Sequence, residues 1–147
     1  MGLDMYLNAK RFIWHNEKEI AEAISKIFPE LNGKGKRVQE VIVRAIFWRK
    51  ANAIHKWFVD NVQNGEDNCS TYDVEREQLE ELRDLVQRVL EDHTLAESLL
   101  PTQEGFFFGG TQYDEYYFAD LEHTRDSINA ILEEFPDQWD FEYHSSW

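Results

Sequence analysis

The sequence predicts an α+β fold in which about four helices pack on a small, mainly antiparallel sheet of three to five short strands. The chain of 147 residues has the length of one domain and is long enough to bury a core. Hydrophobic residues make up 42% of it and aromatic residues 14%, as in a globular protein. Stretches of helical periodicity and of strand-like alternation both occur, without an internal repeat. We therefore expect a single acidic globular domain over residues 1–147.

Eight elements are predicted along the chain from periodicity and from turn signals. In order, they are a strand at 2–14, a helix at 16–29, a strand at 38–47, a helix at 48–63, a short strand at 68–72, helices at 74–92 and 113–134, and a strand at 139–143.

The first three elements are indicated by alternation, capping residues and β-branched residues. Apolar side chains alternate loosely along the first strand, which suits a strand with a bend near Ala9. Asn16 and Glu19 have the spacing of a capping box, and the helix that they begin ends at Pro29. The β-branched run at 41–43 favours a strand after the glycine-containing turn.

The later elements are bounded by equally local signals. A helix is expected to begin near Trp48 and to stop at the Asn-Gly pair 64–65. Asp73 can cap the helix that follows the short strand. Apolar residues repeat at helical spacing over 113–134, and they alternate again over 139–143.

The chain is expected to lie in a reducing compartment. It contains one cysteine, Cys69, so it cannot form an intramolecular disulfide or a cysteine-rich metal site. The N-terminus lacks the layout of a signal peptide, and no apolar run has the length needed to cross a bilayer. We therefore expect a cytoplasmic protein that does not interact with membranes.

Charge is distributed unevenly along the chain. The formal net charge is −14, but residues 1–56 hold 11 Lys or Arg and 6 Asp or Glu, whereas residues 57–147 hold 4 and 23. The field of the acidic portion should repel free nucleic acid and attract cationic surfaces of other proteins. No direct binding of nucleic acid is therefore expected. The other interpretation is that the acidity only keeps the protein soluble.

Two predicted helices carry rows of carboxylates on the side opposite their apolar stripes. The rows comprise Glu77, Glu80, Glu81 and Asp84 on one helix, and Glu115, Glu122, Asp126 and Glu133 on the other. Spacings of three or four residues separate these charges by about 5–6 Å, similar to phosphates along a nucleic-acid strand. Such a surface could occupy the basic nucleic-acid groove of a partner protein. A solvated charged face is the alternative.

The helix predicted at 48–63 places three side chains in unexpected positions. Asn52 falls at the edge of the apolar arc of this helix, and His55 falls inside it. Each of these side chains must therefore find a hydrogen-bond partner within the protein. They either form the floor of a polar pocket or have a structural role. Trp57 falls on the polar side, so it is either covered by the aromatic tail ending in Trp147 or exposed as an anchor for a partner.

The segment 102–117 combines aromatic residues with glycines, which permit close backbone approach. Together with nearby cations it could form a pocket for a planar, anionic ligand such as a nucleotide. The candidate ligand-binding residues are Arg49, Lys50, Asn52, His55, Phe107, Gly109, Gln112 and Tyr113. The alternative is a buried aromatic strand that leads into the next helix.

Signals for catalysis and for metal binding are weak. The five histidines show no HExxH or His-x-x-x-His spacing, and the chain contains neither a G-x-S-x-G motif nor a complete phosphate-binding loop. The acidic residues next to Cys69 disfavour its thiolate form. We therefore assign no catalytic residue, no metal site and no cofactor.

Three segments resemble a family of small, largely uncharacterised proteins carried by tailed phages, prophages and some bacterial genomes. They are MGLDMYL at 1–7, WRKANAIHKWF at 48–58, and GFFFG at 105–109 with YDEYY at 113–117. Together they cover about a fifth of the chain. The resemblance implies an accessory phage gene product, which would act in the host cytoplasm, and such products often counteract host defence. It implies no particular chemistry.

Three functional hypotheses follow. The first is an anti-defence inhibitor, such as an anti-CRISPR protein, whose two carboxylate rows bind a basic nucleic-acid-binding surface of a host protein with Trp57 as an anchor. The second is a protein that binds or sequesters a nucleotide signal in the pocket. The third is an enzyme that acts on nucleotides, for which no nucleophile or base is identified. The sequence leaves the oligomeric state open.

Overall fold

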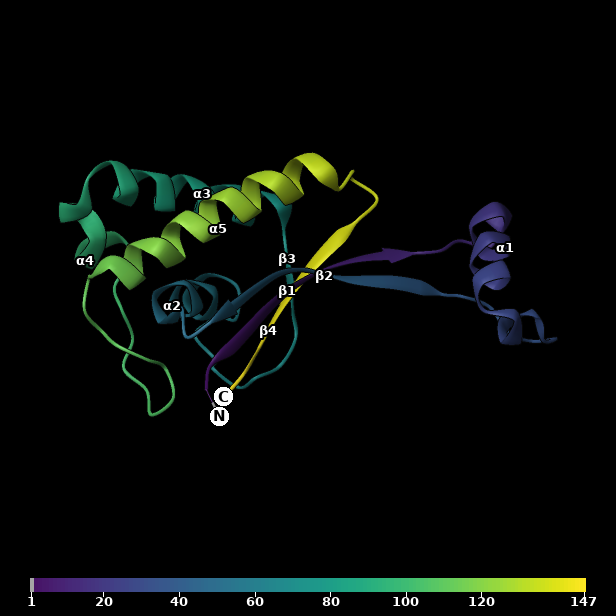
Figure 1. Ribbon diagram of the computed structural model, residues 1–147, viewed down its shortest axis with the longest axis horizontal. Helices are drawn as coiled ribbons and strands as arrows, with labels where there is room; N and C mark the ends of the chain where they lie inside the picture. Colours follow the sequence, from purple (N-terminus) through teal and green to yellow (C-terminus); the bar gives the residue numbers. More distant parts are fainter. Residues whose placement is uncertain (1) are drawn as a thin grey trace.

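The computed structural model describes residues 2–147, which form an α+β fold as predicted (Figure 1). The helices within these residues are α1 (Lys18–Ile27), α2 (Asn52–Asn61), α3 (Arg76–Glu91), α4 (Ala96–Leu99) and α5 (Glu115–Glu134). Two short 3-10 helices are η1 (Pro29–Asn32) and η2 (His93–Leu95). The strands are β1 (Asp4–Phe12), β2 (Glu40–Arg49), β3 (Tyr72–Val74) and β4 (Asp140–Ser146). The single-turn helix α4 was not anticipated.

The four strands form one antiparallel sheet in the order β2-β1-β4-β3. β1 lies inside the sheet, and its alternate side chains Met5, Leu7 and Ala9 are buried, as is Leu3 directly before it. They belong to one hydrophobic core with buried residues of α2, α3 and α5. The alternation that predicted the first strand therefore reflects a sheet with one face against the core.

The bend expected near Ala9 is realised as an irregularity in strand pairing. Leu7 pairs with Ile46, whereas Asn8 pairs with Arg44, so Ala45 of β2 is an extra residue. Such a bulge increases the local twist and changes the direction of the strands. It lies near the point where β1 and β2 leave the body of the protein.

The prediction of a helix starting near Trp48 is wrong, because β2 continues to Arg49. Trp48 pairs with Met5 of β1, and its indole N–H donates to Thr124 Oγ1 of α5 at 2.9 Å. Local periodicity could not detect this end of the strand, which depends on partners far away in sequence. The helix α2 begins three residues later than the last strand residue, at Asn52.

Two predicted caps and one predicted strand also differ from the structure. β3 covers Tyr72–Val74 instead of 68–72, and the cap of α3 is Glu75, which forms a capping box with Gln78, and not Asp73. The helix α1 begins at Lys18 without a side-chain cap, because the Glu17 carboxylate accepts from the Trp14 backbone N–H and pairs with Arg11. At the start of both helices a competing local hydrogen bond decides the boundary.

The chain between β1 and β2 projects from the body of the protein. Figure 1 shows α1 at the end of the two long strands, well separated from the other helices. No residue of α1 is buried. Among residues 2–147, no helix combines the length and apolar character needed to span a bilayer.

Candidate functional site

A pocket of about 370 Å³ lies where four segments meet. Its walls come from the end of β2, the start of α2, the loop that precedes α5 and the first turns of α5. The residues that line it include Arg49, Lys50, Asn52, Thr102, Gly109, Gln112, Asp114, Tyr116 and Asp120. This volume lies within the range of small-molecule sites, roughly 300–1,000 Å³.

The backbone at the pocket wall has an unusual conformation. Lys50 has a φ of 59°, and Gly109, which packs against it, has a φ of 86°. A Cβ on Gly109 would lie 3.2 Å from the Lys50 Cβ, so glycine permits the close approach. Hydrogen bonds from the Lys50 N–H to the Leu3 carbonyl and from the Asn52 N–H to the Lys50 carbonyl hold this conformation. Such strain in a non-glycine residue is often found at binding sites.

Asn52 fastens the loop that forms the far wall. Its side-chain amide donates to the carbonyls of Phe108 at 3.0 Å and Gly110 at 2.9 Å, and its Oδ1 accepts from the Gln103 N–H at 3.0 Å. The side chain is buried with all these groups satisfied. The prediction that Asn52 faces inward is confirmed, and its role here is to shape the pocket.

Two cations lie on one side of the pocket. The Arg49 guanidinium pairs with Asp4 at 2.6 Å, which orients it. Lys50 is exposed and forms no ion pair among the residues that the structure describes. An anionic group that enters the pocket would therefore meet an unpaired ammonium beside a fixed guanidinium.

Two carboxyl groups lie on the α5 side of the pocket. Asp114 caps α5 by accepting from the Tyr117 backbone N–H at 3.1 Å. Burial raises the pKa of Asp120 to about 6; His123 opposes this shift and Asp114 adds to it. No Lys or Arg in residues 2–147 pairs with Asp120. A carboxyl group with a raised pKa in a cleft is a common feature of functional sites.

The predicted ligand-binding set is only partly assembled by the fold. Arg49, Lys50, Asn52, Gly109 and Gln112 line the pocket as expected. His55, Phe107 and Tyr113 do not line it, so placing them there was wrong.

Residues that the sequence interpretation missed complete the lining. Asp114 caps α5, and Tyr116 and Asp120 lie in the first two turns of this helix, where the sequence signals were its apolar stripe and its row of carboxylates. These side chains line the pocket because α5 packs beside the end of β2. No local sequence pattern reveals that packing.

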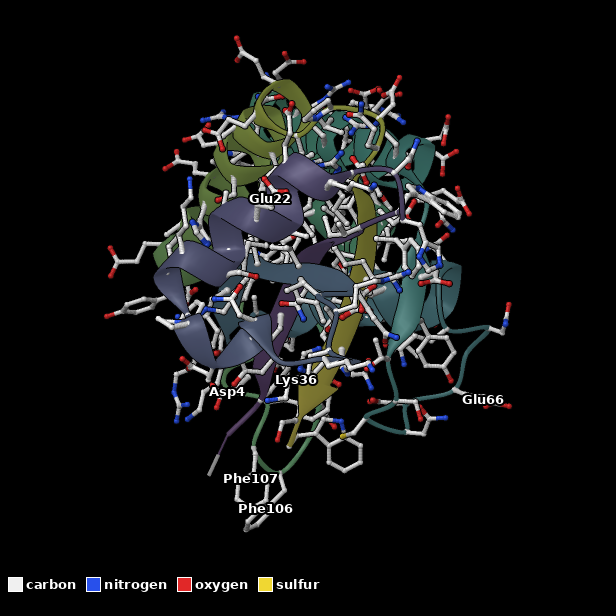
Figure 2. All side chains as sticks on the ribbon, turned by 90° about the vertical axis from the view of Figure 1, so that its right-hand side faces the viewer. Asp4, Glu22, Lys36, Glu66, Phe106 and Phe107 are labelled. Atoms are coloured by element: carbon white, nitrogen blue, oxygen red, sulfur yellow. The ribbon has the colours of Figure 1, made fainter. Side chains whose placement is uncertain are left out.

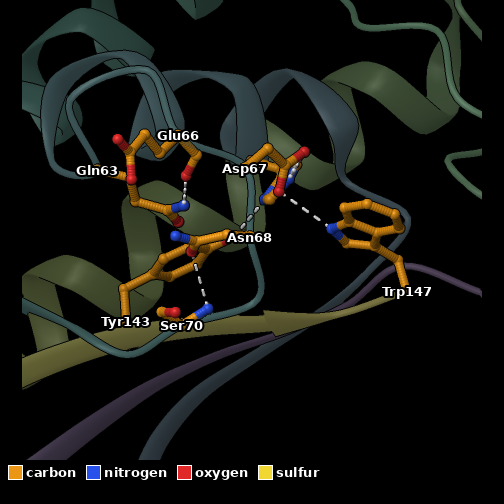
Figure 3. Close-up of polar contacts among 8 residues, drawn as sticks. Gln63, Glu66, Asp67, Asn68, Ser70, Tyr143 and Trp147 are labelled. Carbon is orange, nitrogen blue, oxygen red and sulfur yellow. Dashed lines mark hydrogen bonds and ion pairs between the residues drawn. The ribbon is translucent and has the colours of Figure 1, made fainter.

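Asp67, Tyr143 and Trp147 belong to a network of polar contacts (Figure 3), in which His55 has a structural role. Its side chain is 0% exposed, with Nδ1 2.7 Å from the Tyr143 hydroxyl and Nε2 3.0 Å from Asp67 Oδ2. Asp67 also accepts from the Trp147 indole N–H at 3.0 Å. Burial raises the pKa of Tyr143 well above its usual value, so its hydroxyl stays protonated. The network ties the loop after α2 to α2 itself and to β4.

Of the two alternatives for Trp57, exposure as an anchor for a partner is wrong, because the side chain is buried. Its side chain is 8% exposed, belongs to the hydrophobic core and contacts Phe58 edge-on at a centroid distance of 5.3 Å. The helix α2 is buried on most of its circumference, so its nominally polar side also faces protein. Trp147 lies against Phe108 and donates to Asp67, whereas the aromatic ring that Trp57 contacts within residues 2–147 is that of Phe58. A buried indole cannot anchor a partner without rearrangement.

The aromatic segment before α5 is a loop and not a buried strand. Phe108 is buried, whereas Phe106 is 94% exposed. Figure 2 shows Phe106 and Phe107 together at the tip of the loop, which points away from the body of the protein. The glycines on either side allow turns that interrupt any strand pairing.

The two predicted carboxylate rows are exposed on helices that pack against each other (Figure 1). On α3 they lie opposite the buried residues Leu79, Leu82, Val86 and Val89. Asp84 pairs with Arg83 at 3.0 Å and Asp126 with Arg125 at 2.8 Å. The other six carboxylates form no ion pair among residues 2–147. We call these eight residues the acidic rows of α3 and α5.

No group of three or more His, Cys, Asp or Glu side chains within residues 2–147 has an arrangement that could hold a metal ion. Comparison of the chain with models of known families, with curated proteins and with solved structures gives no match. The resemblance to phage and prophage proteins stays a prediction. The functional conclusion therefore depends on the geometry of the pocket and of the acidic rows.

Proposed function

We propose that this protein binds a small anionic ligand, of the nucleotide class, in the pocket between β2, α2 and α5. The strongest support is that the unpaired Lys50 and Arg49, which is held by Asp4, both line a cavity of about 370 Å³. Lys and Arg together bind phosphate well, because one supplies a compact charge and the other a planar array of donors.

The remaining lining residues suit the other parts of a nucleotide. Gln112 and Thr102 offer hydrogen bonds to a sugar or a base edge. Tyr116 is largely exposed at the pocket and presents a ring on which a planar base can stack. Asp114 and Asp120 can accept from an exocyclic amine. The pocket therefore has an anionic side for amino groups and a cationic side for phosphate.

A thermal-shift series across mono-, di- and cyclic nucleotides tests this proposal. A ligand at about 100 times its Kd should stabilise the folded protein by about 2.7 kcal/mol, which raises the Tm by several degrees. Lys50→Gln should weaken binding about tenfold, because it removes one charged hydrogen-bond partner. Lys56→Gln, which breaks the exposed pair with Asp60, is the matched control and should bind like the wild type.

Absence of any nucleotide-dependent shift, or equal shifts in both lysine variants, would contradict the proposal. The same samples distinguish binding from catalysis, since turnover of the nucleotide during incubation indicates an enzyme. Such turnover would assign the pocket to the third hypothesis.

A second candidate function is supported by the acidic rows of α3 and α5. Six of their eight carboxylates are not neutralised within residues 2–147, and both helices present them to solvent. Such an array suits a basic nucleic-acid-binding surface of a host defence protein, for example a CRISPR effector. In this proposal the rows bind without the help of Trp57.

Charge reversal tests the second candidate. A purified CRISPR effector with its guide RNA is mixed with the protein, and its binding of target DNA is measured at two salt concentrations. Reversal of Glu77, Glu80, Glu81 and Asp84 to Lys should abolish any inhibition, and inhibition by the wild type should weaken with salt. Reversal of the exposed Glu19, Glu22, Glu30 and Glu40 is the control. Equal inhibition by both reversed variants would argue against the acidic rows.

A further inference from the structure

The projecting segment 11–44, which we call the arm, exposes apolar side chains that the rest of the chain does not cover. The arm begins after Lys10, the last residue of β1 that pairs with β4. Beyond Lys10, β1 pairs with β2 alone. Trp14 is 64% exposed and Ile27 70%, and no residue of α1 is buried. The other exposed apolar residues of the arm are Phe12, Phe28, Ile42 and Val43. Exposed apolar side chains concentrated on one segment in this way indicate an interaction site.

The accessible surface of the protein is larger than a compact monomer needs. It measures 9012 Å² for a mass of 17.5 kDa. Compact monomers of that mass expose about 7,900 Å², so the excess is about 1,100 Å². A standard protein interface covers about 800 Å² on each partner. The surface that the arm leaves open is therefore sufficient for a stable interface.

The arm also differs in charge from the rest of the chain. It holds seven Lys or Arg and five Asp or Glu, whereas the remaining residues hold eight and 24. Its tip carries Lys34, Lys36 and Arg37 with no acidic residue between positions 31 and 39. None of these three cations takes part in an ion pair among residues 2–147, and Figure 2 shows Lys36 on the outer side of the arm. The complementary unpaired charges are the acidic rows of α3 and α5.

The arm cannot reach the acidic rows of its own chain. The antiparallel ladder of β1 and β2 continues to the pair Phe12–Glu40, which keeps the arm extended. Figure 1 shows the arm pointing away from α3 and α5. A contact between them within one molecule would require the ladder to break. The same contact between two molecules requires no change in either.

We propose that the arm docks on the acidic rows of α3 and α5 of a second copy of this chain, so that two copies exchange arms reciprocally. Both complementary surfaces occur on one chain, and a two-fold arrangement satisfies both at once in a closed dimer. The basic tip lies against the carboxylates, and the apolar side chains of the arm pack on partly buried residues at the edges of these helices, such as Leu85, Leu90 and Phe118. The arm lies at the opposite end of β2 from the pocket, and only the α5 part of the docking surface adjoins the pocket wall.

Sedimentation or light-scattering mass measurements on the full chain test the proposal. The wild type should form dimers at micromolar concentration that weaken as salt rises. Trp14→Ser with Ile27→Glu should weaken dimerisation at least 30-fold with an unchanged Tm, because both side chains are exposed. Lys34→Glu with Lys36→Glu should weaken it by a similar factor.

A charge exchange provides the decisive comparison. Glu80→Lys with Asp84→Lys should also prevent dimerisation, but a mixture of this variant with the Lys34→Glu, Lys36→Glu variant should restore mixed dimers. Glu66→Lys, in the exposed loop after α2, is the control and should dimerise normally. A monomeric wild type at 100 micromolar and low salt overturns the proposal. Dimers that persist after reversal of Glu80 and Asp84 overturn it as well, because the arm then docks elsewhere. Nucleotide binding in the thermal-shift series should be unaffected in either case.

Discussion

Replacement of His55 by alanine is expected to lower the free energy of unfolding by about 3–4 kcal/mol, because removal of the imidazole ring creates a cavity and leaves buried polar groups without partners. His55 is fully buried between the Tyr143 hydroxyl and the Asp67 carboxylate. Tyr143 is equally buried, so its hydroxyl cannot turn to solvent. The effect is measured by urea unfolding at neutral pH.

A double-mutant cycle distinguishes loss of the network from loss of volume. Tyr143→Phe alone should cost about 1–2 kcal/mol, since it leaves the His55 Nδ1 without its partner. The combined variant should cost less than the sum of the two by about 1 kcal/mol or more. His15→Ala, at an exposed position, is the control and should change stability by less than about 0.5 kcal/mol. Additive effects of His55 and Tyr143 would contradict the network.

Replacement of Asp120 by asparagine, unlike that of His55 by alanine, is expected to raise the free energy of unfolding, by about 1–2 kcal/mol at pH 7.5. Burial raises the pKa of Asp120 from 3.8 to about 6. A shift of that size corresponds to about 3 kcal/mol at full burial, and partial exposure of the group reduces it. Asparagine has nearly the same shape but does not ionise, so it avoids the cost of a charge in the pocket wall.

The advantage of asparagine should depend on pH in a defined direction. Between pH 3.8 and about 6 the folded protein binds more protons at Asp120 than the unfolded chain does. The ionised carboxyl therefore destabilises the fold as pH rises, and the cost is complete above pH 6. Unfolding free energies of the two proteins should coincide near pH 4 and separate by pH 7.5. A constant difference across this range, or a less stable variant, would contradict the assignment.

Glu122 provides a matched control for Asp120 on the same helix. It is exposed and belongs to the acidic rows. Glu122→Gln should change the unfolding free energy by less than about 0.5 kcal/mol at each pH. If Asp120→Asn stabilises the fold while it weakens ligand binding, the carboxyl group is retained at a cost to stability, as expected for a residue of a functional site.

The predicted elements that matched best were those whose signal lies within a single segment. Apolar periodicity placed α3 and α5 almost completely, and alternation placed β1 and β4. The outward direction of the carboxylates was also predictable, since it follows from the helical repeat once the buried stripe is known. These features depend on neighbours three or four residues away and so are visible in the sequence.

The errors around β2 and α2 had a different origin. Trp48 was taken for the start of a helix, but it pairs with Met5 and donates to Thr124, and those partners lie more than 40 residues away in each direction. The helical wheel placed Trp57 on the polar side of the helix, but α2 is buried on most of its circumference, so that side also faces protein. The helical wheel correctly predicted that Asn52 and His55 face inward. It could not predict that Asn52 shapes a pocket and that His55 belongs to a buried network.

The sequence by itself determined the fold class, the separation of charge along the chain and the outward-facing acidic rows, because composition and local repeat are sufficient for these. Only the tertiary structure decided which residues line the pocket, that Trp57 is buried and that the arm stands apart from the body. These properties depend on contacts between segments that are distant in sequence. Such contacts are selected by the packing of the whole chain, which local patterns do not encode.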